Sequence, residues 1–342
     1  MPGFRNVLMP LATSFSLDKM IRRTGKSVVF PFYHMVSDTP PPHIKHLYRV
    51  KSVAEFRTDL DDLLKYFAPL SPEWLLNPRP STGKGKPAFI LSFDDGLHEV
   101  SDIIVPVLEA KGINAVFFLN NNFIGNNALF YRYKVSLLIE RIRTGHLSDD
   151  VLLDVAASMD QREHDQDSLV RGLLSLGYKC SRLISRIARR TDVDFEQYLD
   201  DHKPYLDEKE IRSLQKKGFY IGAHSHDHPL FHQLDPEEQY EEVRSSMAGI
   251  REKFETGYSF FSFPFSDTGV SRTVLQRLYE TPGSVLDASF GTSGLKADEP
   301  FPHYQRIPLE KSPARAEKYL KTEFLFYRMK AIAGRNKVKR RV

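Results

Sequence analysis

Short apolar runs rich in β-branched and aromatic residues alternate along this chain with segments of helical hydrophobic period. Continuous apolar runs of this kind predict strands that are covered on both faces, as in a parallel sheet or barrel. Strands that alternate with helices predict an α/β barrel. The strand-like runs lie at 27–33, 88–93, 114–119, 219–223 and 258–263.

Apolar residues recur at helical spacing in the segments between these runs. One such helix is expected just before Gly112, a good helix-ending residue, and Pro106 requires it to begin nearby or to kink. The residues that set the three clearest helical patterns are Phe56, Leu60, Leu63, Leu64 and Phe67, then Ile103, Ile104, Val107 and Leu108, and finally Tyr240, Val243, Met247, Ile250 and Phe254.

One long segment, from about residue 126 to 205, is helical and charged and contains no strand-like run. We expect it to be a helical insertion on the barrel, and we favour a structural lid over a dedicated binding role. The predicted organisation is an N-terminal extension at 1–26, a barrel at 27–310 and a C-terminal helix with a basic tail at 311–342. We expect the tail to fray, as chain ends commonly do.

The composition is that of an ordinary folded protein, since 41% of the 342 residues are hydrophobic, enough for a large core. The single cysteine, Cys180, excludes an intrachain disulfide framework and a cysteine-based zinc site. A formal net charge of +4 does not by itself indicate a nucleic-acid-binding surface, and we expect no nucleic-acid partner. No apolar run approaches the ~20 residues that span a bilayer. Pro10 and the charges after it argue against a signal peptide, so we expect a cytoplasmic location.

Two adjacent carboxylates follow the second strand-like run, in the sequence Ser92-Phe93-Asp94-Asp95-Gly96. Gly96 permits a tight turn directly after them. Side chains so close together repel each other unless a cation lies beside them. A solvated turn has the same appearance, so this motif alone is weak evidence for a site.

Three histidines follow a later strand-like run, and His224 and His228 are four residues apart. One helical turn would place both imidazoles on one face, an arrangement common among metal ligands, whereas the alternative is a polar loop. His34 and the Phe263-Pro264-Phe265 turn also follow predicted strands. Catalytic groups of (β/α) barrels gather at this C-terminal end of the strands.

Together these motifs resemble the polysaccharide deacetylase family, also known as the NodB-homology domain or carbohydrate esterase family four. Ser92 to Gly96 resembles its first motif, and His224-Ser225-His226-Asp227-His228 resembles its second. Ser262-Phe263-Pro264-Phe265 looks like a reduced form of the third motif. The resemblance covers residues 27–126 and 205–309 and leaves the helical insertion outside.

This resemblance implies a distorted (β/α)7-type barrel that removes acetyl groups from a sugar or polysaccharide. It implies a divalent metal, usually Zn²⁺, with Co²⁺, Ni²⁺ or Fe²⁺ as alternatives, bound by Asp95, His224 and His228. Asp94 would be the general base. The backbone N–H near Phe265, in the turn after Pro264, would stabilise the oxyanion. Phe290 is a candidate for lining the acetyl pocket, with core packing as the alternative.

Two departures from the family pattern concern catalytic residues. Ser262 stands near the place of an arginine that orients the base in many members, and Arg306 is a candidate substitute or else a buried structural arginine. The final-motif histidine, which protonates the leaving amine, is missing. His34 and His303 are the candidates for that general acid, and His34 is slightly favoured because it ends a strand at the expected face.

The expected partner is therefore an acetylated glycan or its precursor, and the oligomeric state is left open. An O-acetyl esterase or a deformylase on the same metal centre is an alternative, as is a glycan-binding protein with a decayed site. Against decay, Asp94, Asp95, His224 and His228 are all intact.

Apolar residues among basic ones near both chain ends would suit a weak contact with an anionic membrane surface, although packing on the barrel is favoured. They are Phe4, Val7, Leu8, Leu11 and Phe15, and Tyr319, Leu320, Phe324 and Phe326.

Overall fold

The structure is a computed structural model that describes residues 2–79, 85–280 and 283–341, with the backbone alone for 2–7. Its strands within these ranges form an eight-stranded parallel sheet in the order β10-β9-β8-β7-β6-β5-β2-β11. The strands are β2 (Pro31–Tyr33), β5 (Leu91–Phe93), β6 (Ala115–Leu119), β7 (Tyr220–Ala223), β8 (Phe260–Ser262), β9 (Ala288–Gly291), β10 (His303–Gln305) and β11 (Ile307–Pro308).

The sheet curls into a nearly closed barrel. Its two edge strands, β10 and β11, are separated in the chain by Arg306 alone, so the two edges of the sheet must lie close together. Counted as one position, they leave seven strand positions around the barrel, which confirms the predicted fold class. A second sheet, in the order β1-β4-β3, consists of β1 (Val28–Val29), β4 (Ala88–Phe89) and β3 (Ala68–Pro69). In the chain, β1 lies just before β2 and β4 just before β5.

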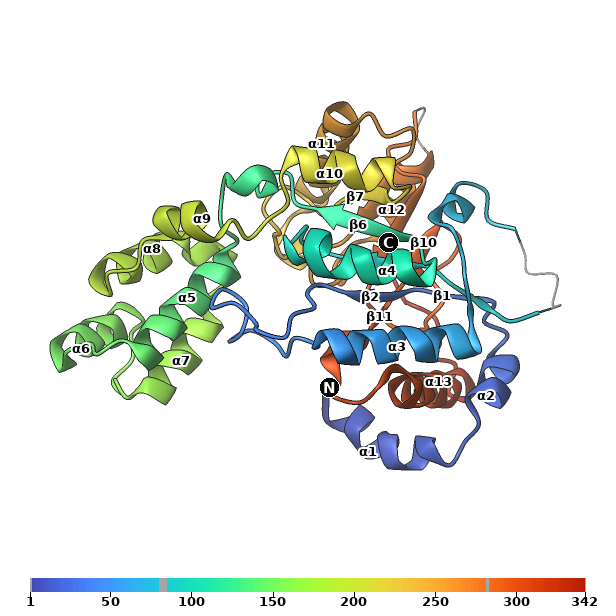
Figure 1. Cartoon of the computed structure of the whole chain (residues 1–342), viewed down its shortest axis with the longest axis horizontal. Coiled ribbons are helices and arrows are strands. Elements are labelled where there is room, and N and C mark those ends of the chain that lie inside the picture. The colour runs from blue at the N-terminus through green and yellow to red at the C-terminus, as the bar shows by residue number, and fades with distance from the viewer. Residues whose placement is uncertain (1, 80–84, 281–282, 342) are drawn as a thin grey trace.

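Helices cover the outside of the barrel (Figure 1). The three predicted helical patterns correspond to α3, α4 and α11. Pro106 lies in the first turn of α4, where its missing N–H is tolerated, and a π-helical turn at Val100–Ile104 precedes it. The helices are α3 (Val53–Tyr66), α4 (Val105–Lys111), α10 (Glu208–Lys216), α11 (Pro236–Phe254) and α12 (Arg272–Glu280).

The barrel interior is aromatic, and its apolar cluster includes Phe30, Phe118, Phe260 and Phe290. A larger cluster fills the layer between the strands and the outer helices. These two layers explain why the strand-like runs are apolar at successive positions, since both faces of each strand are covered.

The predicted helical insertion is confirmed, and it projects to one side of the barrel between β6 and β7 (Figure 1). It has its own apolar core, which also includes Met35, Ile44 and Val50 from the loop after β2. Its helices are α5 (Tyr131–Thr144), α6 (Asp149–Ser158), α7 (Gln166–Ser175), α8 (Ser181–Arg190) and α9 (Phe195–His202).

Helices from the two chain ends pack together below α3: α1 (Pro2–Thr13), α2 (Leu17–Thr24) and α13 (Ala316–Ile332) (Figure 1). Leu8, Leu320 and Phe324 are buried there, whereas Phe4 and Val7 lie outside the described side chains. None of the described helices is long and apolar enough to cross a bilayer. The boundaries at residues 26 and 310 remain a prediction.

The expectation of a frayed basic tail is wrong. The Val338 N–H donates to the Ala297 carbonyl at 2.8 Å, and Arg340 donates to the carbonyls of Asp267 and Val270. The partners of the tail lie about forty to seventy residues earlier in the chain, so no local pattern in the tail indicates them.

Candidate metal centre and active-site cavity

The two carboxylates after β5 lie in a tight turn at the C-terminal edge of the barrel. Asp95 has a φ of +72° and Gly96 a φ of +62°. A Cβ atom at Gly96 would lie 2.8 Å from Leu119 Cδ2, and the positive φ also disfavours a side chain, so the position favours glycine. A non-glycine residue in the left-handed region is strained, and such strain concentrates at functional sites. The turn aims Asp94 and Asp95 into one region instead of at opposite faces of the strand.

His224 and His228 lie close together after β7, but they do not form the expected helical turn. Ser225 and His228 have φ values of +73° and +58°, and the Ser225 hydroxyl accepts a hydrogen bond from the His228 N–H at 3.0 Å. This loop folds back on itself and holds the two imidazole centroids 4.8 Å apart. The reason for the difference is that the Ser225 side chain supplies the loop with its own hydrogen bond.

Asp95, His224 and His228 converge as a candidate metal centre. Asp95 Oδ1 lies 3.6 Å from His224 Nε2 and 3.4 Å from His228 Nε2, and one ligand atom from each residue lies within 4.8 Å of the others. Asp95 Oδ1 and His224 Nε2 are both buried without a hydrogen-bond partner.

The protonation of His224 suits a metal ligand. Its Nδ1 lies 2.7 Å from the Ser262 carbonyl oxygen, which can only accept, so Nδ1 carries the proton and Nε2 presents its lone pair to the centre. Burial lowers the pKa of His224 to about 4, which keeps the ring neutral. Two imidazoles and one carboxylate leave a coordination position open, as in catalytic zinc sites.

Arg306 holds Asp94 from the interior of the barrel. Its guanidinium donates to Asp94 Oδ1 at 2.7 Å and to Oδ2 at 2.6 Å. It also donates to Ser92 and Ser262 and lies 4.1 Å above the Phe32 ring. Burial alone would raise the pKa of Asp94, but the charge of Arg306 lowers it below the ordinary value. Arg306, the predicted orienting residue, thus contacts the predicted base directly and keeps it ionised.

A cavity of about 340 Å³ opens above these carboxylates. It brings together the predicted residues His34, Asp94, Asp95, His228 and Phe265. Its walls come from the loop after β2, from the start of the helical insertion and from the segment after β11. The other lining residues are Phe32, Leu47, Tyr48, Arg49, Phe130, Arg132, Tyr133, Thr292, Glu310 and Lys311.

His34 is paired with a buried glutamate at the side of this cavity. The backbone N–H of His34 donates to Glu310 Oε2 at 2.8 Å, and its ring Nδ1 contacts Oε1. Burial alone would lower the pKa of His34, but the charge and hydrogen bond of Glu310 raise it to about 9. The imidazole is therefore a proton donor at neutral pH.

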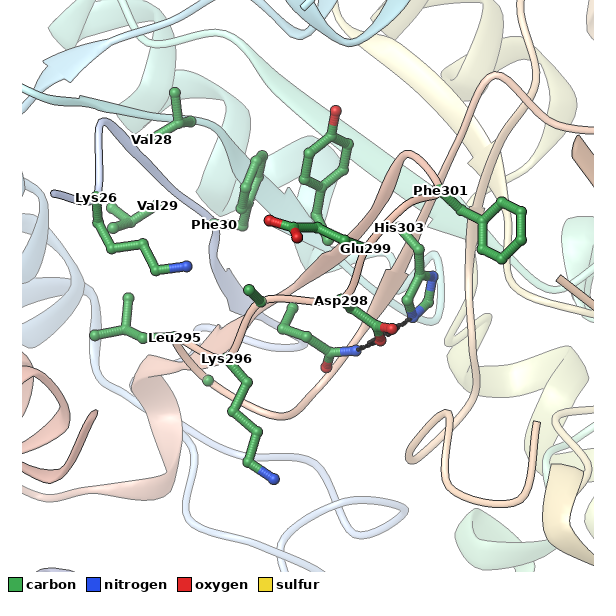
Figure 2. Close-up of a pocket in the computed structure, with 14 residues that line it drawn as sticks. Lys26, Val28, Val29, Phe30, Leu295, Lys296, Asp298, Glu299, Phe301 and His303 are labelled. Carbon is green, nitrogen blue, oxygen red and sulfur yellow. Dashed lines mark hydrogen bonds and ion pairs between the residues drawn. The ribbon is translucent and has the colours of Figure 1, made fainter. Parts of the chain in front are cut away.

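The structure does not bring His303 to this cavity. Tyr304 and Arg306 contact the barrel interior, so His303 in the same strand faces outward. Its Nδ1 lies 2.6 Å from Ser289 Oγ and its Nε2 lies 3.1 Å from Asp267 Oδ2. Figure 2 shows His303 beside Asp298 in a separate pocket.

Asp267, Asp298 and His303 form a second acidic group, but this group already contains a cation. The Arg340 guanidinium contacts both carboxylates. A bound metal would have to displace this arginine, so the first group is the better candidate for a metal centre.

Phe265 and Phe290 differ in their surroundings. Phe265 has a φ of +55°, lines the cavity and places its ring centroid 4.4 Å from that of His228. Pro264 precedes it and has no N–H to donate. Phe290 packs in the barrel core, 5.7 Å from Phe30 between ring centroids, and does not line the cavity. Of the two expectations for Phe290, the structure agrees with core packing.

Tyr133 and Glu310 are site residues that the sequence reasoning missed. The Tyr133 hydroxyl, from α5 of the insertion, donates to Asp95 Oδ2 at 2.8 Å. Burial and the Asp95 charge raise the pKa of Tyr133 well above its ordinary value, so the hydroxyl remains a donor. Glu310 lies in the short helical turn at Leu309–Lys311 that follows β11, and no apolar run marked that strand in the sequence. Tyr133 lies in a helix with no motif of its own.

Comparisons with known proteins agree with this fold. The deacetylase PplD of Streptococcus pyogenes, in complex with acetate, superposes with a TM-score of 0.50 at 12% identity, over 85% of this chain and 95% of that one. A de-N-acetylase from Aggregatibacter actinomycetemcomitans gives a TM-score of 0.50 at 12% identity, over 85% and 97%. At such low identity these structures establish similarity of fold alone.

The sequence comparisons are more specific. No curated protein matches the chain significantly. The sequence model of the polysaccharide deacetylase family matches residues 81–282, more than half of the chain, including the helical insertion. This chain therefore belongs to the polysaccharide deacetylase family.

Proposed function

We propose that this hydrolase removes N-acetyl groups from an acetylated carbohydrate with the help of a divalent metal bound by Asp95, His224 and His228. Zn²⁺ suits this ligand set best, and Co²⁺, Ni²⁺ and Fe²⁺ are alternatives. When bound, such an ion lowers the pKa of a water molecule and polarises the acetyl carbonyl.

The protein residues have separate tasks in this proposal. Asp94 accepts the proton of the attacking water at Oδ1, which keeps a second lone pair beyond the one that Arg306 occupies, whereas Oδ2 accepts from both Arg306 and Ser262. The Phe265 N–H stabilises the oxyanion, and Pro264 shapes the turn that presents it. His34 donates a proton to the leaving nitrogen, and Glu310 keeps His34 protonated.

The observation that carries this proposal is the pair of buried, unpartnered atoms Asp95 Oδ1 and His224 Nε2, which face each other at 3.6 Å. Leaving two such acceptors buried and unsatisfied costs about 1–3 kcal/mol each. A cation between them removes this cost, and His228 Nε2, 3.4 Å from Asp95 Oδ1, supplies a third ligand.

Amide hydrolysis is favoured over ester hydrolysis by the His34–Glu310 pair. An amine leaves only when it is protonated, whereas an activated ester needs little help. An O-acetyl esterase or a deformylase remains a second candidate on the same centre. A decayed glycan-binding site is disfavoured because the Asp94–Arg306 ion pair and the cluster of Asp95, His224 and His228 are both assembled.

Acetate release tests the proposal. Metal-stripped protein is incubated with an acetylated chito-oligosaccharide before and after addition of Zn²⁺, with an activated acetyl ester in parallel. We expect turnover of both substrates that depends on the metal. Metal-independent turnover of both would refute the metal mechanism, and turnover of the ester alone would favour the esterase.

A weak contact with an anionic membrane surface is a separate proposal about the chain ends. Leu11, Phe15, Met329 and Ile332 are exposed, although α1 and α13 pack together. Cosedimentation with anionic liposomes at low and moderate salt tests it, and the absence of salt-sensitive binding leaves the packing role alone.

A further inference from the structure

Three cationic side chains surround the active-site cavity, and each comes from a different part of the fold. Arg49 lies in the loop after β2, Arg132 lies near the start of α5 in the insertion, and Lys311 follows β11. Because no single helix or loop supplies them, their convergence is a property of the assembled site.

The carboxylates of this cavity do not neutralise the three cations. Asp94 is bound by Arg306 and Glu310 by His34. Asp95 belongs to the proposed metal centre. These carboxylates thus have partners other than Arg49, Arg132 and Lys311. We call these three cations, which line the cavity, the rim cations.

The rim cations themselves differ in how free they are. Arg49 is paired with Glu55 at the surface. Arg132 gives one N–H to the Leu174 carbonyl at 2.8 Å, a neutral acceptor, and within the part of the chain that the structure describes no ion pair compensates its charge. Lys311 is exposed, and no carboxylate of the described residues forms an ion pair with it. Arg132 and Lys311 therefore present two uncompensated charges.

We propose that the substrate of this site carries an anionic group, a phosphate or a carboxylate, that binds between Arg132 and Lys311 while its acetyl group reaches Asp94. This inference rests on the proposed deacetylase function and adds the substrate class. The planar guanidinium of Arg132 suits two oxygens of such a group, and the Lys311 ammonium acts as a point charge. The helical insertion thereby contributes to substrate selection.

Matched substrates test the inference. Steady-state kinetics of the Zn²⁺-loaded protein are measured with N,N′-diacetylchitobiose, with its 1-phosphate, and with an acetylated disaccharide that contains a uronic acid. We expect a lower KM for at least one anionic substrate, and the phosphate and carboxylate arms identify which group is preferred. This advantage should shrink as salt is raised, because charges near solvent are screened over about 8 Å at 0.15 M.

Arg132→Gln and Lys311→Gln should each raise KM for the anionic substrate by roughly threefold to tenfold and leave kcat and the neutral substrate nearly unchanged. Arg182→Gln and Lys179→Gln are the matched controls, since both residues are exposed on the insertion and neither lines the cavity. The controls should behave as wild type.

The outcomes separate the two proposals. Turnover of the neutral substrate with no preference for the anionic ones, or equal effects of the variants on both, overturns the anionic subsite and leaves the deacetylase intact. If no substrate is hydrolysed, titration of the metal-free protein with the 1-phosphate and the neutral sugar still decides the subsite. Equal affinity for the two would then overturn it.

Discussion

Buried charges around the cavity lie beside groups of opposite sign, and this pairing sets the protonation state of each residue. Arg306 lowers the pKa of Asp94, so the proposed base is ionised. Glu310 raises the pKa of His34, so the proposed acid is protonated. One site thus holds a base and an acid ready at the same pH.

Glu310→Gln should move the pH profile of amide hydrolysis. His34 donates a proton only below its pKa of about 9, so activity falls as the pH rises through that value. Loss of the Glu310 charge lowers this pKa, and the alkaline limb of kcat/KM should shift to lower pH by about one unit or more. Glu109→Gln, outside the cavity, is the control. An unchanged alkaline limb would exclude the pair as the acid.

His224→Ala should lose metal and activity together, because two remaining ligands hold a zinc-like ion weakly. Asp94→Asn should lose turnover and keep the metal, since it removes a base and no ligand. His226→Ala should keep both, because His226 Nε2 contacts Ser245 at 3.0 Å instead of the centre. Elemental analysis after dialysis measures the metal, and full occupancy in His224→Ala would contradict the ligand assignment.

The convergence of Asp94, Asp95, His224 and His228 was predictable from the sequence because all four follow apolar strands. The loop geometry was not, since it depends on the Ser225 hydroxyl and on left-handed residues that spacing does not reveal. The sequence favoured His34 only slightly over His303, because the direction of the His303 side chain could not be inferred. It depends on which face of β10 points inward, and a short, polar strand carries no alternation that shows this.

The helical insertion is the element that extends the site beyond the barrel. Through Tyr133 it touches a proposed metal ligand, and through Phe130 it lines the cavity beside His228, with ring centroids 4.5 Å apart. A purely structural lid would not need these contacts. The insertion's helical character was predictable from its hydrophobic period. Its contact with Asp95 was not, because Tyr133 lies in a helix, Asp95 follows a strand, and no local pattern links the two positions.

Tyr133→Phe should weaken metal binding by about 10–100-fold, since partners of metal-bound carboxylates orient their ligands. The ring remains, so packing in the insertion should be preserved. Tyr131→Phe in the same helix is the control, because its ring contacts Tyr178 and it does not line the cavity. Competition with a chromophoric zinc chelator measures the affinity. Equal affinities for wild type and Tyr133→Phe would show that Tyr133 does not support the metal ligand.

Among the barrel strands, the apolar ones were predictable and β9, β10 and β11 were not. These last strands are two to four residues long, and they contain the polar residues Ser289, His303 and Gln305. Their pairing comes from closure of the barrel instead of from a local hydrophobic run. Arg306 lies between β10 and β11, so the same closure delivers it to Asp94.

At the scale of the whole molecule, the C-terminal tail connects two loops of the barrel through ion pairs. Arg340 joins Asp267, just after the Phe265 turn, to Asp298 in the loop between β9 and β10. The tail therefore supports the outer side of a segment whose inner side lines the cavity.

Arg340→Met should destabilise the fold by about 3–5 kcal/mol, because it leaves two largely buried carboxylates without their cation. Lys339→Met, at an exposed position of the same tail, should have little effect. The free energy of unfolding in urea measures both. Equal stability of the two variants would show that the tail is not required for the fold.

The most direct measurement of the central claim is an anomalous difference map at the zinc edge from crystals of the Zn²⁺-loaded protein. We expect one dominant peak among Asp95 Oδ1, His224 Nε2 and His228 Nε2, with zinc–ligand distances of about 2.0–2.2 Å. No peak there, or a dominant peak at Asp267, Asp298 and His303, would contradict the proposed catalytic centre.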